Sequence, residues 1–149
     1  MTEEITIRLA TAADDAAIAD VIHNARLAAE DTGFEHDYTA QETRQWREQL
    51  ERENGGVIVA HAGTVPAGFG VLERVAEGVA SLGVWVAPAF RRRGLGTNIA
   101  TSTLDFARER GFRRIRGRML EGETALSFLG GIGALVPLVN PNMEFELPL

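Results

Sequence analysis

The amino-acid sequence predicts an α/β domain with a mixed, mostly antiparallel sheet flanked by helices. Three observations lead to this fold class. Short apolar runs separated by tight turns between residues 57 and 86 predict an antiparallel meander. The last of these runs leads through a glycine-containing loop into an amphipathic helix. A further strand pattern follows that helix, and a helical crossover of this length makes the two strands parallel.

The first third of the chain predicts one strand and two helices. Residues 4–9 alternate between polar and apolar, as in a half-buried strand. Thr11 to Asp14 is a capping box that begins a helix. The expected buried stripe of that helix consists of Ala17, Ile18, Val21, Ile22, Ala25 and Ala29. A polar, acidic loop over residues 30–38 precedes a second capping box, Thr39 to Glu42, and a helix expected to turn Trp46 and Leu50 inward.

The remaining elements continue the α/β pattern. The meander strands are expected at Val57 to His61, Ala67 to Val75 and Val79 to Val86. A helix over Thr97 to Arg110 ends at Gly111, a residue suited to the left-handed conformation of a helix C-terminus. We then expect a parallel strand at Arg113 to Met119, a short helix at Glu121 to Gly131, and closing strands at Ala134 to Val139 and Met143 to Leu147.

Composition sets limits on the class of protein. The 149 residues predict a single domain, residues 1–149. The absence of cysteine excludes disulfides, thiolate metal sites and a cysteine nucleophile, and it favours a cytoplasmic location. No apolar run approaches the roughly 20 residues that cross a bilayer, so we expect no membrane contact. The three histidines are scattered, and we therefore expect no metal.

The charges are divided unevenly along the chain. Residues 1–90 carry 15 acids and 6 arginines (net −9), and residues 91–149 carry 6 acids and 9 arginines (net +3), which together give the net charge of −6. The basic part begins at the loop between the strand ending at Val86 and the helix. Residues 14–53 hold 11 acids and 4 arginines.

The loop before the helix is a candidate anion site. A strand that enters a helix through Gly94 and Gly96 leaves backbone N–H groups converging at the positive end of the helix dipole, where phosphate binds readily. Arg91 to Arg93 add positive charge. No Gly-Lys-Ser/Thr follows, which excludes a P-loop, and Ile99 replaces the third glycine of the dinucleotide fingerprint.

The segment Arg91-Arg92-Arg93-Gly94-Leu95-Gly96 resembles the acyl-CoA loop of the GNAT N-acetyltransferase superfamily, Arg/Gln-x-x-Gly-x-Gly/Ala. The element order resembles that family over nearly the whole chain. The resemblance implies the GNAT fold, with two central parallel strands that splay apart, and acetyl-CoA as cosubstrate with its pantetheine in the gap. It assigns cofactor binding to Val84, Trp85, Val86, Arg91, Arg92, Arg93, Gly94, Leu95, Gly96 and Thr97.

The resemblance also implies direct transfer of an acetyl group to an amine. The amine has to be neutral when it attacks, the thiolate that leaves benefits from an acid, and a strand N–H near Val86 could stabilise the oxyanion. The sequence departs from the family at the usual acid and base. The family asparagine and tyrosine of the late helix correspond to Gly122 and Leu129, and the family carboxylate corresponds to Ala80.

Substitutes for those groups come from several elements. Our candidate catalytic residues are Glu73 on the preceding strand, Glu121 after the parallel strand, and Ser127 on the late helix. His23 and His36 are further candidate bases, with an unperturbed pKa of about 6.5. His61 is expected to be structural, and Tyr38 is the chain's single tyrosine.

The acceptor and the partners are open at this stage. The acidic stretch over residues 14–53 would steer a small cationic amine or a peptide N-terminus to the site. A GNAT-like domain that binds acyl-CoA as a sensor or interaction module, without transfer, is the alternative. Nucleic-acid binding through the arginines of residues 108–118 is disfavoured by the net charge of −6. A homodimer through late strands is compatible with the family resemblance.

Overall fold

A computed structural model describes residues 4–27, 36–90, 94–118 and 144–149. Its helices and strands follow the predicted order closely. They are β1 Ile5–Leu9, α1 Asp15–Leu27, α2 Ala40–Arg52, β2 Gly56–Ala62, β3 Val65–Ala76, β4 Val79–Val86, α3 Leu95–Glu109, β5 Arg114–Arg118 and β6 Glu144–Pro148. The helix and strand expected over residues 121–131 and 134–139 lie outside the described residues.

The described strands form one sheet in the order β1-β2-β3-β4-β5-β6. Every neighbouring pair is antiparallel except β4 and β5, which are parallel as predicted. The paired register of β4 with β5 covers only Val79 to Ser81, whereas β4 continues to Val86. The two parallel strands therefore separate beyond Ser81, and the predicted fold with splayed central strands is confirmed.

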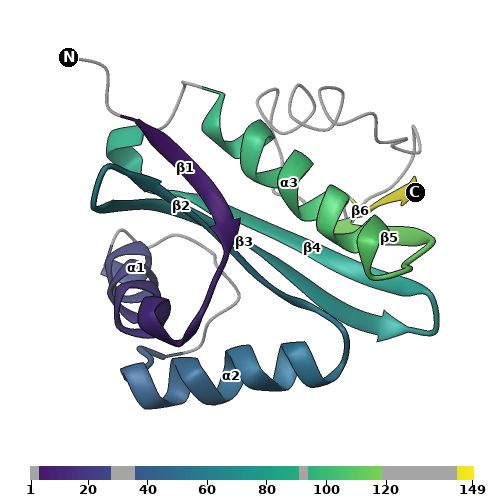
Figure 1. Cartoon of the computed structure of the whole chain (residues 1–149), viewed down its shortest axis with the longest axis horizontal. Helices are drawn as coiled ribbons and strands as arrows, with labels where there is room; N and C mark the ends of the chain where they lie inside the picture. Colours follow the sequence, from purple (N-terminus) through teal and green to yellow (C-terminus); the bar gives the residue numbers. More distant parts are fainter. Residues whose placement is uncertain (1–3, 28–35, 91–93, 119–143) are drawn as a thin grey trace.

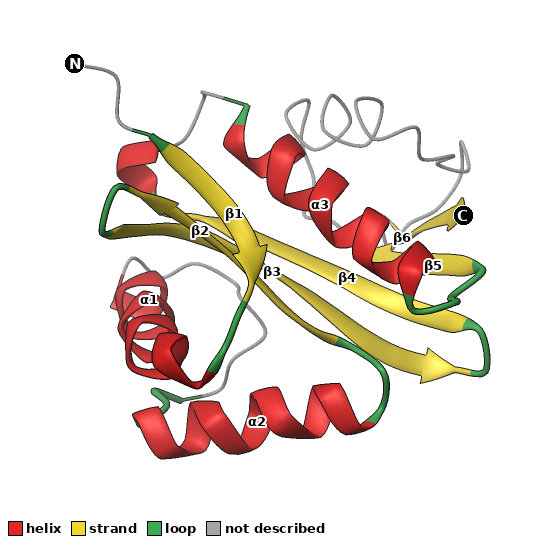
Figure 2. Ribbon diagram, in the orientation of Figure 1, coloured by secondary structure: helices red, strands yellow, loops and turns green. Residues whose placement is uncertain are grey.

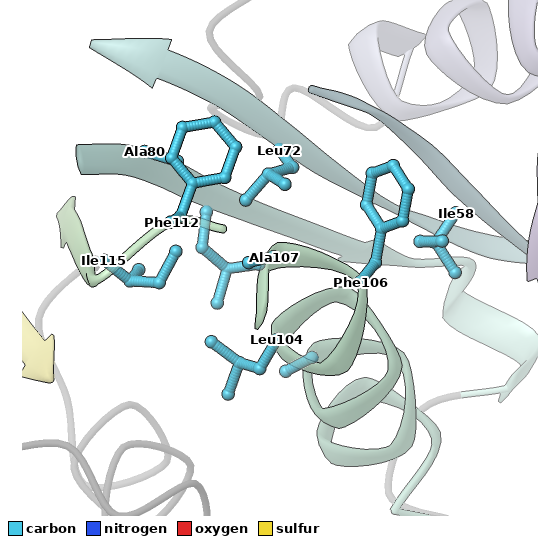
Figure 3. Packing of buried hydrophobic residues seen from close by; sticks show 10 residues of the cluster. Ile58, Leu72, Ala80, Leu104, Phe106, Ala107, Phe112 and Ile115 are labelled. Carbon is cyan, nitrogen blue, oxygen red and sulfur yellow. The ribbon is translucent and has the colours of Figure 1, made fainter. Parts of the chain in front are cut away.

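The helices cover the two faces of the sheet. Helices α1 and α2 lie on one face and α3 lies on the other (Figures 1 and 2). On the α3 face, Leu104, Phe106 and Ala107 pack against Ile58, Leu72 and Ala80 of the sheet (Figure 3). On the opposite face, Ile18, Val21 and Ile22 of α1 and Leu50 of α2 pack against Val57, Val59, Phe69 and Trp85. Two apolar layers thus enclose the middle of the sheet.

Helix α3 approaches β3 closely at two glycines. A Cβ built at Gly70 would collide with Thr103 Oγ1, and one built at Gly68 would lie 3.0 Å from Ile99 Cδ1. Only glycine leaves room for this approach, which fixes the height of α3 above the sheet. Helix α3 begins at Leu95, two residues before the expected start, because Gly94 adopts φ 77° as its N-cap and Leu95 is already buried.

The first two helices begin as the sequence predicts. In the second capping box, Glu42 N–H donates to Thr39 Oγ1 (3.0 Å) and Thr39 N–H donates to Glu42 Oε1 (3.1 Å). Thr11 N–H donates to Asp14 Oδ2 (2.7 Å), and a short 3-10 turn, Ala12–Asp14, leads into α1. The sequence did not predict that α2 also buries Thr43 and Arg47.

Candidate active site

Beyond Ser81, the register of β4 with β5 has ended, and one backbone edge of β4 points toward the β5 side. Ala87 N–H donates to Ala67 C=O (2.8 Å), so the backbone groups of these two residues face each other across β3 and β4. Along two antiparallel strands, residue pairs whose backbone groups face each other alternate with pairs whose backbone groups point outward. The backbone groups of Trp85 therefore point to β3, and those of Leu82, Val84 and Val86 point to the β5 side. There the register with β5 has already ended at Ser81.

The N-terminus of α3 lies at the loop that follows β4. The first α-helical hydrogen bond at this end joins Asn98 N–H to Gly94 C=O (3.1 Å). The N–H groups of the first turn, Leu95 to Thr97, have no acceptor within the helix. Gly94 has no side chain to cap them and is exposed, and among the described residues, its chain neighbours aside, no heavy atom lies within 4 Å of where its Cβ would be. Open N–H groups at a positive helix end favour an anion.

Buried side chains hold this loop at both flanks. Phe90 closes a 3-10 turn, Pro88–Phe90, and Leu95 opens α3; the two residues are 9% and 5% exposed. Both pack in one cluster with Ile99. Arg91, Arg92 and Arg93, which the sequence assigns to the cofactor, lie outside the described residues.

The other face of the sheet brings together charged groups from α1 and the segment before α2. His23 Nδ1 lies 2.7 Å from Asp37 Oδ2, and Arg26 Nη1 donates to Asp37 Oδ1 (2.7 Å). The hydrogen bond from Arg26, followed by that from His23, lowers the pKa of Asp37. The sequence made His23 a candidate base but did not make Asp37 a candidate, because the two lie 14 residues apart. The only sequence feature that pointed to Asp37 was its place in the acidic loop.

Aromatic rings connect this segment to the sheet. His36 stacks on Tyr38 with 5.0 Å between ring centroids, and Tyr38 meets Trp46 edge-on at 6.4 Å. Tyr38 and Trp46 pack against the buried cluster that contains Trp85 of β4. Tyr38 is thus far from β4 in sequence but lies on the same side of the sheet as the Trp85 side chain. The sequence placed it in a loop and did not predict this contact.

The candidate acid–base residues have different positions. Glu73 is exposed on β3, opposite Ser81, where the opening between β4 and β5 begins. Because side chains alternate along a strand, Glu73 shares a face with Val71, which packs on the α1/α2 side. Ala80 is fully buried in the α3-side core, so the family's carboxylate position faces the core here. Glu121 and Ser127 lie outside the described residues.

Many carboxylates of the acidic stretch over residues 14–53 are engaged in ion pairs. The pairs are Asp14 with Arg8, Asp15 and Glu51 with Arg47, Asp37 with Arg26, and Glu48 with Arg44. Arg8 donates to both carboxylate oxygens of Asp14, and these bonds lower the pKa of Asp14 to about 2. The acidic stretch therefore stabilises the α1/α2 side of the fold through ion pairs, and it also gives that side a negative net charge.

The described residues contain neither a membrane-spanning helix nor a metal-binding cluster. None of their helices is long and apolar enough to cross a membrane. Within the same part of the chain, no three histidine or carboxylate side chains are grouped so that they could hold a metal ion.

Solved structures share this fold over nearly the whole chain. The yncA structure from Salmonella typhimurium, with its cofactor acetyl-CoA, is 22% identical, with a TM-score of 0.83 over 97% of this chain and 94% of that one. The phosphinothricin acetyltransferase (Pat) from Sinorhizobium meliloti, in complex with AcCoA, is 16% identical, with a TM-score of 0.84 over 100% and 89%. Ribosomal-protein-alanine N-acetyltransferase from Brucella melitensis is 21% identical, with a TM-score of 0.82 over 97% and 99%.

The sequence itself matches a family model. No curated protein sequence matches the chain at a significant level. The model of the acetyltransferase (GNAT) family matches residues 22–126, which include β4, the following loop and α3. This match covers more than half of the chain, and it agrees with the resemblance found in the glycine loop. The chain therefore belongs to the acetyltransferase (GNAT) family of enzymes.

Proposed function

We propose that this enzyme takes the acetyl group of acetyl-CoA and passes it directly to a primary amine, with residues 1–149 acting as one catalytic domain. The observation that carries the proposal is the separation of β4 from β5 beyond Ser81, beside the uncapped N-terminus of α3. Two of the similar structures also contain acetyl-CoA.

The two parts of the site match the two parts of the donor. Pantetheine is an extended chain with two amides, and it can add alongside β4 beyond Ser81 by pairing with backbone groups such as those of Val84. The pyrophosphate is an anion and suits the N–H groups of Leu95 to Thr97. In this arrangement Gly94 and Gly96 let the phosphates approach the backbone, and Arg91 to Arg93 neutralise their charge.

Transfer requires few groups from the protein. The neutral amine attacks the thioester carbonyl carbon, the C–N bond forms, and the oxyanion is stabilised by a β4 N–H near Val84 or Val86. The C–S bond then breaks, and the CoA thiolate leaves and takes up a proton. Glu73 accepts the proton of the incoming ammonium, directly or through water, because it is an exposed carboxylate on the α1/α2 face of the sheet, where the proposal places the acceptor. Glu121 and Ser127 remain candidates for the second proton transfer.

The acceptor in this proposal is a small cationic amine or a peptide N-terminus. The 11 acids and 4 arginines of residues 14–53 give this side of the chain a net negative charge, even though many of the carboxylates are paired. A negative field attracts the protonated amine before Glu73 removes its proton. Acceptors that carry extra carboxylates should therefore react more slowly than equally sized cationic amines.

Donor binding can be tested at Gly94 with a matched control. Gly94 and Gly63 both adopt positive φ, 77° and 61°, and in the part of the chain that the structure describes neither has a non-neighbouring heavy atom within 4 Å of where its Cβ would be. In calorimetric titrations with acetyl-CoA, we expect Gly94→Trp to weaken binding by roughly 30-fold, about 2 kcal/mol, and Gly63→Trp to leave it nearly unchanged. Circular dichroism checks that both variants are folded. If they then bind acetyl-CoA with equal affinity, the proposal that the donor binds at the α3 N-terminus is wrong.

The transfer step can be tested at Glu73. We expect Glu73→Gln to lower kcat by roughly 10²-fold without changing acetyl-CoA affinity. Glu77→Gln is the control, because Glu77 is an exposed carboxylate in the neighbouring turn. Equal rates in the two variants would exclude Glu73 as the base. Tight acetyl-CoA binding by the wild type, without thiol release for any amine in a broad panel, would instead favour the sensor alternative.

A further inference from the structure

We propose that two copies of this chain associate edge to edge through β1, which continues the sheet across a two-fold axis at Ile7. Strand β1 is the outermost strand of the described sheet at its N-terminal edge. The occupant of this edge is a second copy of the same chain, and the proposal is independent of the acceptor or donor chemistry. The outward backbone, the apolar side chains and the neighbouring charges all support it.

The outer edge of β1 carries hydrogen-bonding groups in an alternating pattern. Gly63 N–H donates to Glu4 C=O (2.9 Å) and Ala10 N–H donates to Val57 C=O (2.8 Å), so the even-numbered residues of this strand bond to β2. By alternation, Ile5, Ile7 and Leu9 direct their N–H and C=O groups away from the sheet. The C=O of Leu9 accepts one bond from Arg8 Nη1 (3.2 Å) and keeps a second lone pair.

The pattern of β1 is self-complementary about Ile7. In an antiparallel pair of β1 strands with Ile7 opposite Ile7 of the second copy, Ile5 lies opposite Leu9 of that copy. All three pairs are then hydrogen-bonded pairs. Ile5 and Leu9 are 41% and 38% exposed, which makes them two of the few large apolar side chains exposed among the described residues. In such a two-fold dimer, Ile5 and Leu9 of each copy contact the second copy, so the same surface is buried on both, as in an isologous interface.

An open groove beside β1 extends this apolar surface on the α3 face. It has a volume of about 600 Å³ and an apolar floor of Ile7, Leu9, Ile58 and Phe106. Its remaining charged lining consists of Arg8, Arg110, Asp105 and Glu109. Arg8 is paired with Asp14 (2.8 Å) and Asp105 with Arg108 (3.0 Å), which leaves Arg110 and Glu109 as one lining charge of each sign. The groove is therefore close to neutral, although the whole chain has a net charge of −6. The edge is therefore a place where two acidic copies can approach without strong repulsion.

The two edge strands of the described sheet differ in the residues that discourage strand addition. Edge strands are commonly protected by charges and proline. The sequence of β6 contains two glutamates and a proline, whereas β1 contains neither. Its one charged residue, Arg8, is held by both oxygens of Asp14 at 2.8 Å. This contrast favours β1 over β6 as the dimer edge.

Sedimentation of the full-length chain tests the proposal. We expect the wild type to sediment with twice the chain mass, and Ile5→Lys with Leu9→Lys to sediment as a single chain. The control is Val65→Lys with Val75→Lys, because these valines are even more exposed, at 51% and 50%, but lie on β3. The control should stay dimeric. A monomeric wild type, or a dimer that survives the β1 substitutions, would overturn the proposal.

Cross-linking tests the register without charged substitutions. The chain contains no cysteine, so one introduced thiol per copy reports on one position. Opposed residues in a hydrogen-bonded antiparallel pair have Cα atoms about 5.5 Å apart, within the range that a disulfide spans. Mild oxidation should therefore cross-link Ile7→Cys and leave Val65→Cys monomeric on a denaturing gel. Equal cross-linking of the two variants would overturn the two-fold register.

Discussion

The two faces of the sheet are held by different kinds of contact. On the α3 face, apolar side chains and the bare backbone of Gly68 and Gly70 meet the helix at close range. The α1/α2 face also has an apolar layer, but the buried charged residues Asp14, Asp15 and Arg47 all lie there. The α3 face positions a helix against the sheet by shape, whereas the α1/α2 face positions helices by specific ion pairs.

This difference corresponds to what each face has to do in the proposed reaction. The N-terminus of α3 must stay in line with the end of β4 to hold the donor, and close packing fixes that distance. The α1/α2 face meets the acceptor, and ion pairs there keep the helices in place while exposing polar groups around Asp37 and Tyr38. The following variants test the two kinds of support.

The largest expected effect is at the buried ion pair. Arg47 donates to Asp15 Oδ1 and Oδ2 (2.7 and 3.0 Å), and both side chains are 6% exposed. Arg47→Leu leaves Asp15 buried without its partner, so we expect the free energy of unfolding to fall by about 4 kcal/mol in urea titrations. Combining it with Asp15→Leu should recover most of this loss. A double variant as unstable as the single one would contradict this explanation.

A smaller loss is expected where α3 approaches β3. The methyl group of Gly70→Ala would overlap Thr103 Oγ1, so α3 has to move outward. We expect a loss of about 3 kcal/mol in the same urea titration. Gly83→Ala on β4 is the control, because its nearest neighbour, Val71 Cβ, would lie 3.9 Å away. Similar losses in both variants would show that backbone freedom, rather than packing, sets the cost.

The next effect depends on pH. The ion pair with Arg8 lowers the pKa of Asp14 from 3.8 to about 2. Because the folded pKa lies below the unfolded one, this contribution is complete above about pH 4 and is lost as the pH falls towards 2. We expect Asp14→Asn to cost about 2 kcal/mol at pH 7 and to flatten the stability profile between pH 4 and 2. An unchanged profile would contradict the assigned pKa.

The smallest effect compares two buried threonines. Thr43 on α2 buries a hydroxyl that has no partner among the residues that the structure describes, whereas Thr103 on α3 donates to Ile99 C=O (2.8 Å). Thr43→Val should therefore stabilise the fold by about 1 kcal/mol. Thr103→Val should give no gain, since it removes a satisfied hydrogen bond. Thermal unfolding of both variants measures the difference, and an equal gain in both would contradict the role of hydrogen bonding.

Sequence patterns were reliable where the interacting residues are near one another. The second capping box, the β3–β4 hairpin and the passage from β4 through Gly94 into α3 each involve neighbouring residues, and the structure confirms them. The start of α3 was expected two residues late, because the burial of Leu95 depends on its contact with Phe90 and Ile99. Buried Arg47 was missed since its partner is 32 residues away.

The sequence by itself determined the family, the order of elements and the glycine loop, because these depend on local periodicity and on contiguous motifs. The tertiary structure decided which distant groups meet. It placed Asp37 against His23 and Arg26, Tyr38 on the Trp85 side of the sheet, and Ile5 and Leu9 on an open edge. Such contacts depend on how strands pair and how helices pack, so they cannot be predicted from the residues that adjoin each position in the sequence.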